Sequence, residues 1–272
     1  MKKRKNFFID LIMLPLCLII VYPFFFIVST SLKPPSEVAS NPFGLTLNLT
    51  LNNYLYVFEN VPILRAFFNN VIITTSSVAL IVIFGTMAAY PVVFNRNKLN
   101  DFATGYILAG FLVPTQAILL PLYLLTIKLQ IYDKIYGLIL LYTAGTSLAF
   151  YLCMGYMKTL PRDVFESAII DGCSIWGVFW KVILPLLTPI VTTIVIFNTF
   201  GIWNDFLYPY LFLSHRENQT LIIEVNRTRL QFNTEWGLAL AITTLVLIPL
   251  FVFYIASQKY IVKGLASGAV KG

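Results

Sequence analysis

Six apolar stretches constrain what this sequence can fold into more than any other feature. They cover about residues 8–32, 67–94, 102–127, 135–157, 186–213 and 237–257. A bilayer-spanning helix needs about 20 apolar residues, and in hydrocarbon each spanning segment must satisfy its backbone hydrogen bonds internally. The sequence therefore predicts one all-α transmembrane domain over residues 1–272, built as a bundle of six spans.

Composition supports a membrane protein and excludes several other classes. Hydrophobic residues make up 58% of the chain and charged residues only 11%, whereas soluble proteins carry about 25% charged residues. The net charge of +7 comes from basic residues in short loops between apolar stretches. Such residues set membrane topology, so no nucleic-acid partner is predicted. Three scattered cysteines and a single histidine predict neither a disulfide framework nor a metal site.

Lysine and arginine are distributed unevenly between the two sides of the predicted bundle. With the N-terminus inside, twelve fall in inner segments and seven in outer segments, which accounts for all 19. Inner loops carry the excess in membrane proteins, so both termini are predicted to be cytoplasmic. The basic N-terminus followed by an apolar run looks like a signal peptide. The run from Leu11 to Leu32 is longer than the usual hydrophobic region of about 7–15 residues, so it is predicted to be a retained first span.

Residues 158–185, between the fourth and fifth stretches, are too polar and too interrupted to cross a bilayer. They predict a helix-turn-helix on the cytoplasmic face. Pro161 suits the first turn of the first helix, where its missing N–H costs nothing. Phe165, Ala168 and Ile169 are predicted to share one apolar face by their spacing.

The second half of this segment has its own turn and capping signals. Gly172 permits a turn after the first helix, and Ser174 is predicted to cap a second helix. The apolar side of that helix is predicted to carry Ile175, Phe179, Val182 and Ile183. Pro185 and Pro189 interrupt the helical pattern at the start of the next apolar stretch.

The order Glu166-Ser167-Ala168, then Asp171-Gly172, then Leu184-Pro185 resembles the EAA loop of bacterial ABC importer permeases. Ser167 stands where the family usually has alanine, and it is still small. The resemblance implies that this segment docks into a groove on a cytoplasmic ATPase. The coupling residues it implies are Glu166, Ser167, Ala168, Asp171, Gly172 and Pro185. The alternative interpretation is an interfacial helix that lies on lipid headgroups.

Polar residues within the apolar stretches are candidates for a substrate pathway, because a carboxylate at membrane depth must be paired or face water. Asp205 is the strongest, and the run Trp203-Asn204-Asp205-Phe206 is similar to one common in sugar-type members of the same family. Asn70 in the second stretch and Gln116 in the third are further candidates. The alternative for Asp205 is that it ties the outer ends of helices together. For the polar start of the second stretch, the alternative is helix packing.

The C-terminal tail, residues 258–272, resembles that of maltose-type sugar permeases. The resemblance implies that Gly264, Gly268 and Lys271 approach the ATPase subunits. The alternative is a basic terminus attracted to anionic lipid. Two outer segments are predicted at about 33–66 and 214–236, and the charge mixture of the second is interpreted as solvated surface or as a contact with a soluble partner.

Together these features predict a non-enzymatic permease subunit of a bacterial ABC importer for a sugar or oligosaccharide, placed in the inner membrane. No phosphate-binding loop is present, so ATP and Mg²⁺ are expected on separate ATPase subunits, and this chain is expected to bind no cofactor. The resemblance also implies a second, non-identical permease, two ATPase subunits and an external solute-binding protein. The alternatives are a permease for another polar solute, a stand-alone secondary transporter or channel, and a membrane enzyme.

Overall fold

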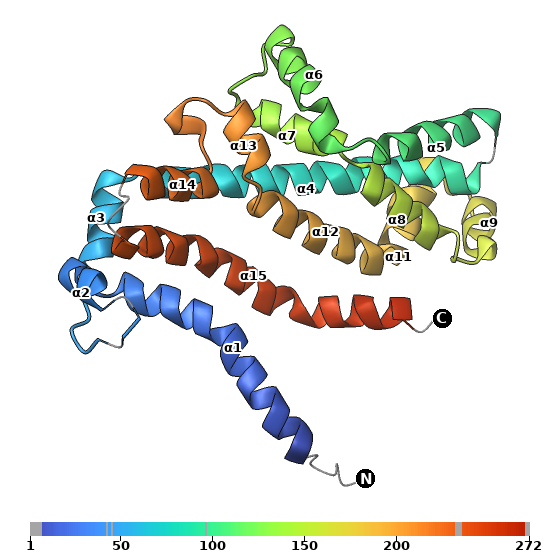
Figure 1. Ribbon diagram of the computed structural model, residues 1–272. Helices are drawn as coiled ribbons and strands as arrows, with labels where there is room; N and C mark the ends of the chain where they lie inside the picture. Colours follow the sequence, from blue (N-terminus) through green and yellow to red (C-terminus); the bar gives the residue numbers. More distant parts are fainter. Residues whose placement is uncertain (1–6, 42, 45, 96, 232–235, 270–272) are drawn as a thin grey trace. The chain divides into compact units, whose positions relative to one another are not determined.

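The computed structural model describes residues 7–41, 43–44, 46–95, 97–231 and 236–269, and Figure 1 shows them as helices joined by short connections. No strand occurs among these described residues, so the all-α prediction is confirmed. The chain forms two compact units. One comprises Met1–Phe67 with Leu221–Phe251, and the other comprises Phe68–Thr220 with Val252–Gly272.

Three helices are each long and apolar enough to cross a membrane without a break. They are α1 (Phe7–Ser31), α4 (Ile63–Phe94) and α15 (Trp236–Ala269). They correspond to the first, second and sixth predicted stretches. The structure extends α4 toward its N-terminus and continues α15 past residue 257 into the predicted tail. Local hydropathy therefore located these helices well.

Three bent pairs of helices qualify as spans only when each pair is taken together. The first two pairs fall on the third and fourth predicted stretches, and the third combines part of the predicted helix-turn-helix with most of the fifth stretch. The pairs are α5 (Lys98–Phe111) with α6 (Thr115–Lys128), α7 (Ile135–Ala144) with α8 (Ser147–Met157), and Ile175–Leu186 with α12 (Thr188–Trp203). Their bends are 102°, 43° and 72°. Counting each pair as one span gives up to six spans by length and composition.

Local chemistry explains two of these breaks. Pro114 precedes α6 with an extended backbone, φ −61° and ψ 127°, and the residue before a proline is steered away from the helical region. Pro189 lies in the first turn of α12, where proline fits a helix start but not a helix interior. The apolar run alone did not reveal these bends, because hydropathy is the same on both sides of each break.

Over the fifth predicted stretch, 186–213, the helix is interrupted at a point that concerns the site. Helix α12 stops at Trp203, and a separate short helix, α13, runs over Leu207–Phe212. Asn204 and Asp205 therefore lie in an elbow between two helices rather than inside one span. Asp205 Oδ1 accepts a hydrogen bond of 2.9 Å from the Leu207 N–H, which satisfies a backbone donor at the start of α13.

Short helices complete the first unit: α2 (Pro35–Ser40), α3 (Asn52–Asn60) and α14 (Leu221–Gln231). The buried Asn53 amide donates to the carbonyls of Ser31 and Lys33, at 2.8 and 2.9 Å. These bonds tie α3 to the end of α1. Glu224 on α14 is fully buried, so the interpretation of 214–236 as solvated surface is wrong there. Helical periodicity turns one face of α14 into the unit even though the segment is rich in charge.

In the second unit, α4 and α8 approach closely at a small residue. A Cβ on Gly85 would lie 2.8 Å from the Cβ of Ala149, which is too close for real atoms. Small residues at helix interfaces permit such approaches in membrane proteins. The core around this crossing is apolar and includes Phe150, Cys153 and Phe179.

Asp133 holds a loop of the second unit together near the short helix η2 (Arg216–Asn218). Its carboxylate accepts hydrogen bonds from the backbone N–H groups of Ser214 and His215, at 2.8 and 3.0 Å, and it contacts the His215 ring. The Asn218 amide donates to the Asp133 carbonyl at 2.8 Å. Burial raises the pKa of Asp133, but the bonds from His215, Asn218 and Ser214 outweigh it and hold the pKa below its ordinary value.

Candidate functional site

The segment predicted as a helix-turn-helix forms one continuous feature, α9 to α11, which we call the lever (residues 162–186). It consists of α9 (Arg162–Ile170), α10 (Ile175–Val178), a π-helical stretch η1 (Phe179–Ile183) and α11 (Leu184–Leu186). Pro161 stands at the N-cap of α9 with φ −60° and ψ 130°, one residue before the first turn in which it was predicted. The lever leads directly into α12 (Thr188–Trp203), so it is joined through the chain to a helix of the bundle.

Two residues of α9 attach the lever to the end of α4. The Phe165 ring stacks on Phe94, with centroids 4.6 Å apart and an interplanar angle of 16°, and meets Tyr90 edge-on at 6.2 Å. Ala168 is buried beside it, with 8% of its surface exposed. Ile169, which helical spacing places on the same face, is 38% exposed. The buried face of α9 therefore rests on Phe165 and Ala168.

The turn between α9 and α10 depends on the backbone of one glycine. Gly172 has φ +85°, a left-handed conformation that disfavours side chains. The Cys173 N–H donates to the Ala168 carbonyl and the Gly172 N–H to the Ile169 carbonyl, both at 3.0 Å. This is the Schellman pattern, which satisfies the last carbonyls of a helix. A Cβ at this position would meet no atom within 4 Å, so the need for glycine is conformational rather than steric.

The second half of the lever is capped and buried as its sequence predicted, with one exception. The Ser174 hydroxyl accepts a hydrogen bond of 3.1 Å from the Gly177 N–H, and Phe179 and Ile183 are buried. Ile175 is 62% exposed, so its predicted place on the apolar side is wrong. Its carbonyl instead accepts a hydrogen bond of 2.9 Å from the Tyr90 hydroxyl.

Tyr90 is the residue that sequence reasoning missed. It is buried, packs on Phe179 with centroids 5.1 Å apart, and contacts both halves of the lever. An aromatic residue near the end of a span is equally typical of an interfacial belt, so its sequence position carries little signal. The contact joins α4 to the lever across 85 residues of sequence.

The outer face of the lever, meaning the face that does not contact α4, combines acidic and large apolar side chains. Glu166, Ser167, Asp171 and Pro185 are all exposed there. Ile170 is 85% exposed and Trp176 55% exposed, and Ile169, Ile175 and Trp180 are exposed as well. Large apolar side chains gathered in a polar setting mark an interaction surface. The lever thus has one face fixed to the helices and one face available to another molecule.

The structure brings some of the pathway candidates together at the α12–α13 elbow. The Tyr142 hydroxyl of α7 donates a hydrogen bond of 2.7 Å to Asp205 Oδ2, and the Tyr142 ring stacks on Tyr208 with centroids 5.5 Å apart. The Asn70 amide of α4 donates to the Trp203 carbonyl at 3.4 Å. Asp205 therefore ties the elbow to α7, as its alternative interpretation expected.

The remaining candidates are more dispersed. Asn204 is exposed and its amide donates to the Phe200 carbonyl of its own helix at 2.9 Å. Gln116 is exposed on α6. Gly264 and Gly268 lie in the last turns of α15, and Lys271 lies outside the described residues. In the described part of the chain, no three His, Cys, Asp or Glu residues are arranged to hold a metal ion.

The sequence of this chain matches a known protein family and several known proteins. Residues 81–267 match the family model of the binding-protein-dependent transport system inner membrane component. The chain is 31% identical over 252 residues to the melibiose/raffinose/stachyose import permease protein MelC of Bacillus subtilis, covering 92% of this chain and 91% of the relative. It is 30% identical over 260 residues to the arabinooligosaccharides transport system permease protein AraQ of Halalkalibacterium halodurans, covering 93% and 92%.

A solved structure shares the fold. It is described as a bacterial ABC transporter involved in the import of the acidic polysaccharide alginate, with a TM-score of 0.84 at 21% identity over 93% of this chain and 95% of the other. The family model matches residues 81–267, which begin within α4, end in the last turn of α15 and include the whole lever. The chain is therefore a multi-pass membrane protein that belongs to the family of binding-protein-dependent transport system inner membrane components.

Proposed function

We propose that this chain is a permease subunit of an ATP-driven importer for a sugar or oligosaccharide. The observation that carries the proposal is the two-faced lever, fixed to α4 through Phe165 and Tyr90 and exposing Glu166 and Asp171 on its other side. The sugar class is supported by the names of relatives that are about one-third identical, MelC and AraQ. The chain performs no covalent chemistry in this scheme.

The proposed topology has six spans and both termini in the cytoplasm. The pairs α5–α6 and α7–α8 each count as one span, α12 forms the fifth span without the lever helices that precede it, and the excess of lysine and arginine in inner segments sets the orientation. This orientation puts the lever in the cytoplasm, where ATP is available. Two ATPase subunits bind ATP and Mg²⁺ and receive the outer face of the lever, and the C-terminal tail with Gly264, Gly268 and Lys271 approaches them.

The proposed mechanism is alternating access driven through the lever. ATP closes the ATPase dimer, the docked lever moves with it, and α4 and α12 move because Phe165 packs on α4 and α11 continues into α12. Ligands shift such an equilibrium only if they bind its states differently. ATP does so through the ATPase subunits, and the external binding protein does so by delivering solute to the outward-facing state.

The proposed pathway is formed with a second, non-identical permease and passes near the α12–α13 elbow. Asn70, Trp203, Asn204 and Asp205 lie at or next to this elbow, and Gln116 is a further candidate. The elbow is joined to α7 through the hydrogen bond from the Tyr142 hydroxyl to Asp205, and a change in this bond permits a local change of helix direction. Aromatic rings beside it, such as Tyr208, suit the apolar C–H face of a sugar.

Charge reversal on the lever tests the proposal. Glu166→Lys should leave the chain in the membrane but reduce the co-purifying ATPase and abolish ATP-driven uptake, because the exposed carboxylate faces the docking partner. Glu166→Gln keeps the shape and should have a smaller effect. Glu59→Lys makes the same charge change on an exposed position of α3 and should retain the ATPase. Normal docking and uptake by Glu166→Lys would refute the assigned coupling role.

A further inference from the structure

Two cavities follow one another along the same three helices of the second unit. The first, of about 340 Å³, is lined by the C-terminal end of α4, the start of α5, the end of α8 and the start of α9. The second, of about 610 Å³, lies between the same α4, α5 and α8 farther along their length. Helix α5 packs against α8, and both cavities lie where these two helices meet α4; we call the two cavities together the groove.

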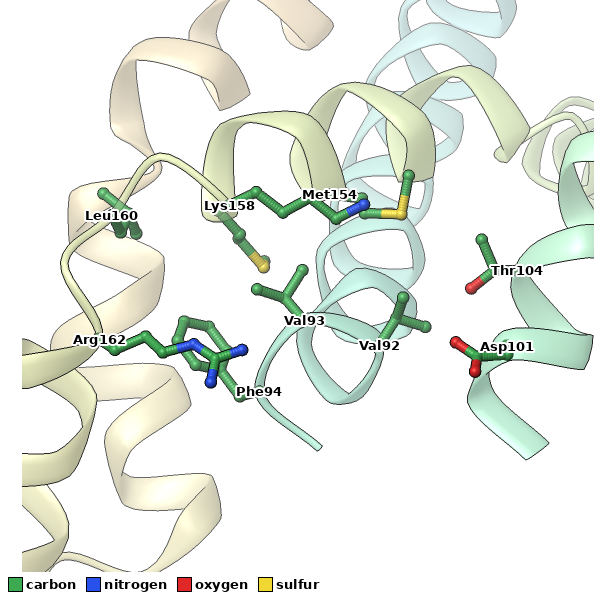
Figure 2. Close-up of a pocket in the computed structure, with 10 residues that line it drawn as sticks. Val92, Val93, Phe94, Asp101, Thr104, Met154, Lys158, Leu160 and Arg162 are labelled. Atoms are coloured by element: carbon green, nitrogen blue, oxygen red, sulfur yellow. The ribbon is translucent and has the colours of Figure 1, made fainter. Parts of the chain in front are cut away.

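The first cavity has charges of both signs on opposite walls. Figure 2 shows Arg162 beside Phe94 at one side of the cavity, the Asp101 carboxylate of α5 at the other side, and Lys158 extending along α8 toward Met154, with Val92 and Val93 of α4 between them. The described residues include no salt bridge across this cavity. Two cations on one wall suit a phosphate group, and a carboxylate opposite them suits a hydroxyl or ammonium donor.

The second cavity is apolar. Phe84 and Ala88 of α4, Ile107 and Gly110 of α5, and Phe150 of α8 are among its lining residues. Along α4, residue 84 lies eight positions from the Val92 of the first cavity, or about 12 Å at 1.5 Å per residue. That length accommodates about ten carbons of an extended hydrocarbon chain, so a charged end and an apolar channel lie in line.

We propose that this groove is a binding site for a phospholipid. The phosphate lies at Lys158 and Arg162, a donor-bearing headgroup such as glycerol or ethanolamine contacts Asp101, and one acyl chain runs past Gly110 and Phe150. The proposed orientation of the importer puts the charged end at the cytoplasmic membrane surface, so the lipid comes from the inner leaflet. In that respect alone the site rests on the proposed function.

The chemistry of the groove distinguishes a lipid from other occupants. A free phosphate or sugar phosphate would leave the apolar cavity empty, and a helix of a partner chain would leave the charged wall without a partner. Phosphatidylcholine carries a phosphate but no N–H or O–H on its headgroup, so it has nothing to donate to Asp101. The site should therefore prefer phosphatidylglycerol and phosphatidylethanolamine over phosphatidylcholine.

The test measures bound lipid directly. The full assembly is purified in detergent, incubated with phosphatidylglycerol, and examined by native mass spectrometry for lipid retained on this chain. The double variant Lys158→Gln/Arg162→Gln should lose about fivefold in apparent affinity, because each partly exposed ion pair contributes a factor of a few. The matched control Lys128→Gln/Lys134→Gln removes two exposed lysines near the far ends of α6 and α7 and should bind as the parent does.

A second pair of variants tests the apolar end. Gly110→Leu places a branched side chain in the cavity, where the nearest atom to a new Cβ is 4.0 Å away. It should lower affinity about tenfold by displacing acyl methylenes. Gly105→Leu makes the same change on the same helix at a residue that lines neither of the two cavities and where a Cβ meets nothing within 4 Å, and it should bind normally. Both changes remove a helix-interior glycine, so neither is expected to disturb α5.

Several results would overturn the site. They are retention of phosphatidylglycerol at parental level by Lys158→Gln/Arg162→Gln, equal binding of phosphatidylcholine, equal behaviour of the two leucine variants, or a partner helix found in the groove. Competition by soluble glycerol phosphate at the same concentration as the lipid would also overturn it. The readout is bound lipid rather than uptake, so a negative result leaves the importer assignment standing. Conversely, failure of the Glu166 test would leave any measured lipid site intact.

Discussion

Replacing Gly172 by alanine should weaken the lever without touching its contacts. A left-handed conformation costs an alanine about 1–2 kcal/mol, and the stiffer unfolded chain returns about 0.4–1 kcal/mol of this. Steric contact adds nothing to this cost, because a Cβ at Gly172 meets no atom within 4 Å. The net loss is therefore about 1 kcal/mol, which corresponds to about a fivefold rise in local opening of the turn.

Amide hydrogen exchange over residues 162–178 measures this opening, and ATP-driven uptake measures its consequence. Gly172→Asn should recover part of the loss, because asparagine tolerates the left-handed region better than alanine. Gly155→Ala on α8 is the matched control: it also adds a methyl group in open space, at a glycine without positive φ, and it should be neutral or stabilising. Equal exchange for Gly172→Ala and Gly155→Ala, or slower exchange for Gly172→Ala than for Gly172→Asn, would refute the argument from backbone conformation.

Two further predictions concern hydrogen bonds elsewhere in the second unit. Tyr142→Phe removes the donor to Asp205 and should lower thermal stability by about 1–2 kcal/mol, whereas Tyr106→Phe at an exposed position should not; equal unfolding temperatures would show that the elbow is held by other contacts. Because the pKa of Asp133 is lowered in the folded state, its contribution to stability is present above the unfolded-state pKa and is lost as pH falls through the folded value, below about 3.8. Asp133→Asn should remove that part of the acid transition in thermal unfolding, and an unchanged transition would contradict it.

Much of the lever could be predicted from its own residues. Gly172, Ser174 and Pro161 each act through backbone groups one to five positions away, so their roles follow from local chemistry. Ile169 and Ile175 are exposed although spacing groups them with the buried residues, because helical spacing identifies a possible apolar face but not which part of it finds a partner. That partner is the end of α4, where Tyr90 and Phe94 lie, and nothing in the lever's own pattern refers to it.

The elbow at Asp205 also combines an interaction that follows from local sequence with one that requires the folded structure. Hydropathy is averaged over a window of residues, so a break of a few residues inside an apolar run leaves the average unchanged. The break exists because Asp205 finds two donors, the Leu207 N–H in its own turn and the Tyr142 hydroxyl on α7. Only the second of these requires the tertiary structure, and it lies 63 residues away in sequence.

The sequence by itself determined that this chain is helical, that it lives in a membrane, and that an acidic, glycine-hinged segment separates its fourth and fifth apolar stretches. Apolar length, backbone hydrogen bonding in hydrocarbon and turn chemistry are local properties, so they can be predicted from the sequence. The tertiary structure decided which face of the lever is buried, that Asp205 meets Tyr142 of α7, and that Asp101, Lys158 and Arg162 line one cavity. Those features depend on contacts between residues that are far apart in the sequence, and such contacts form only when the chain folds.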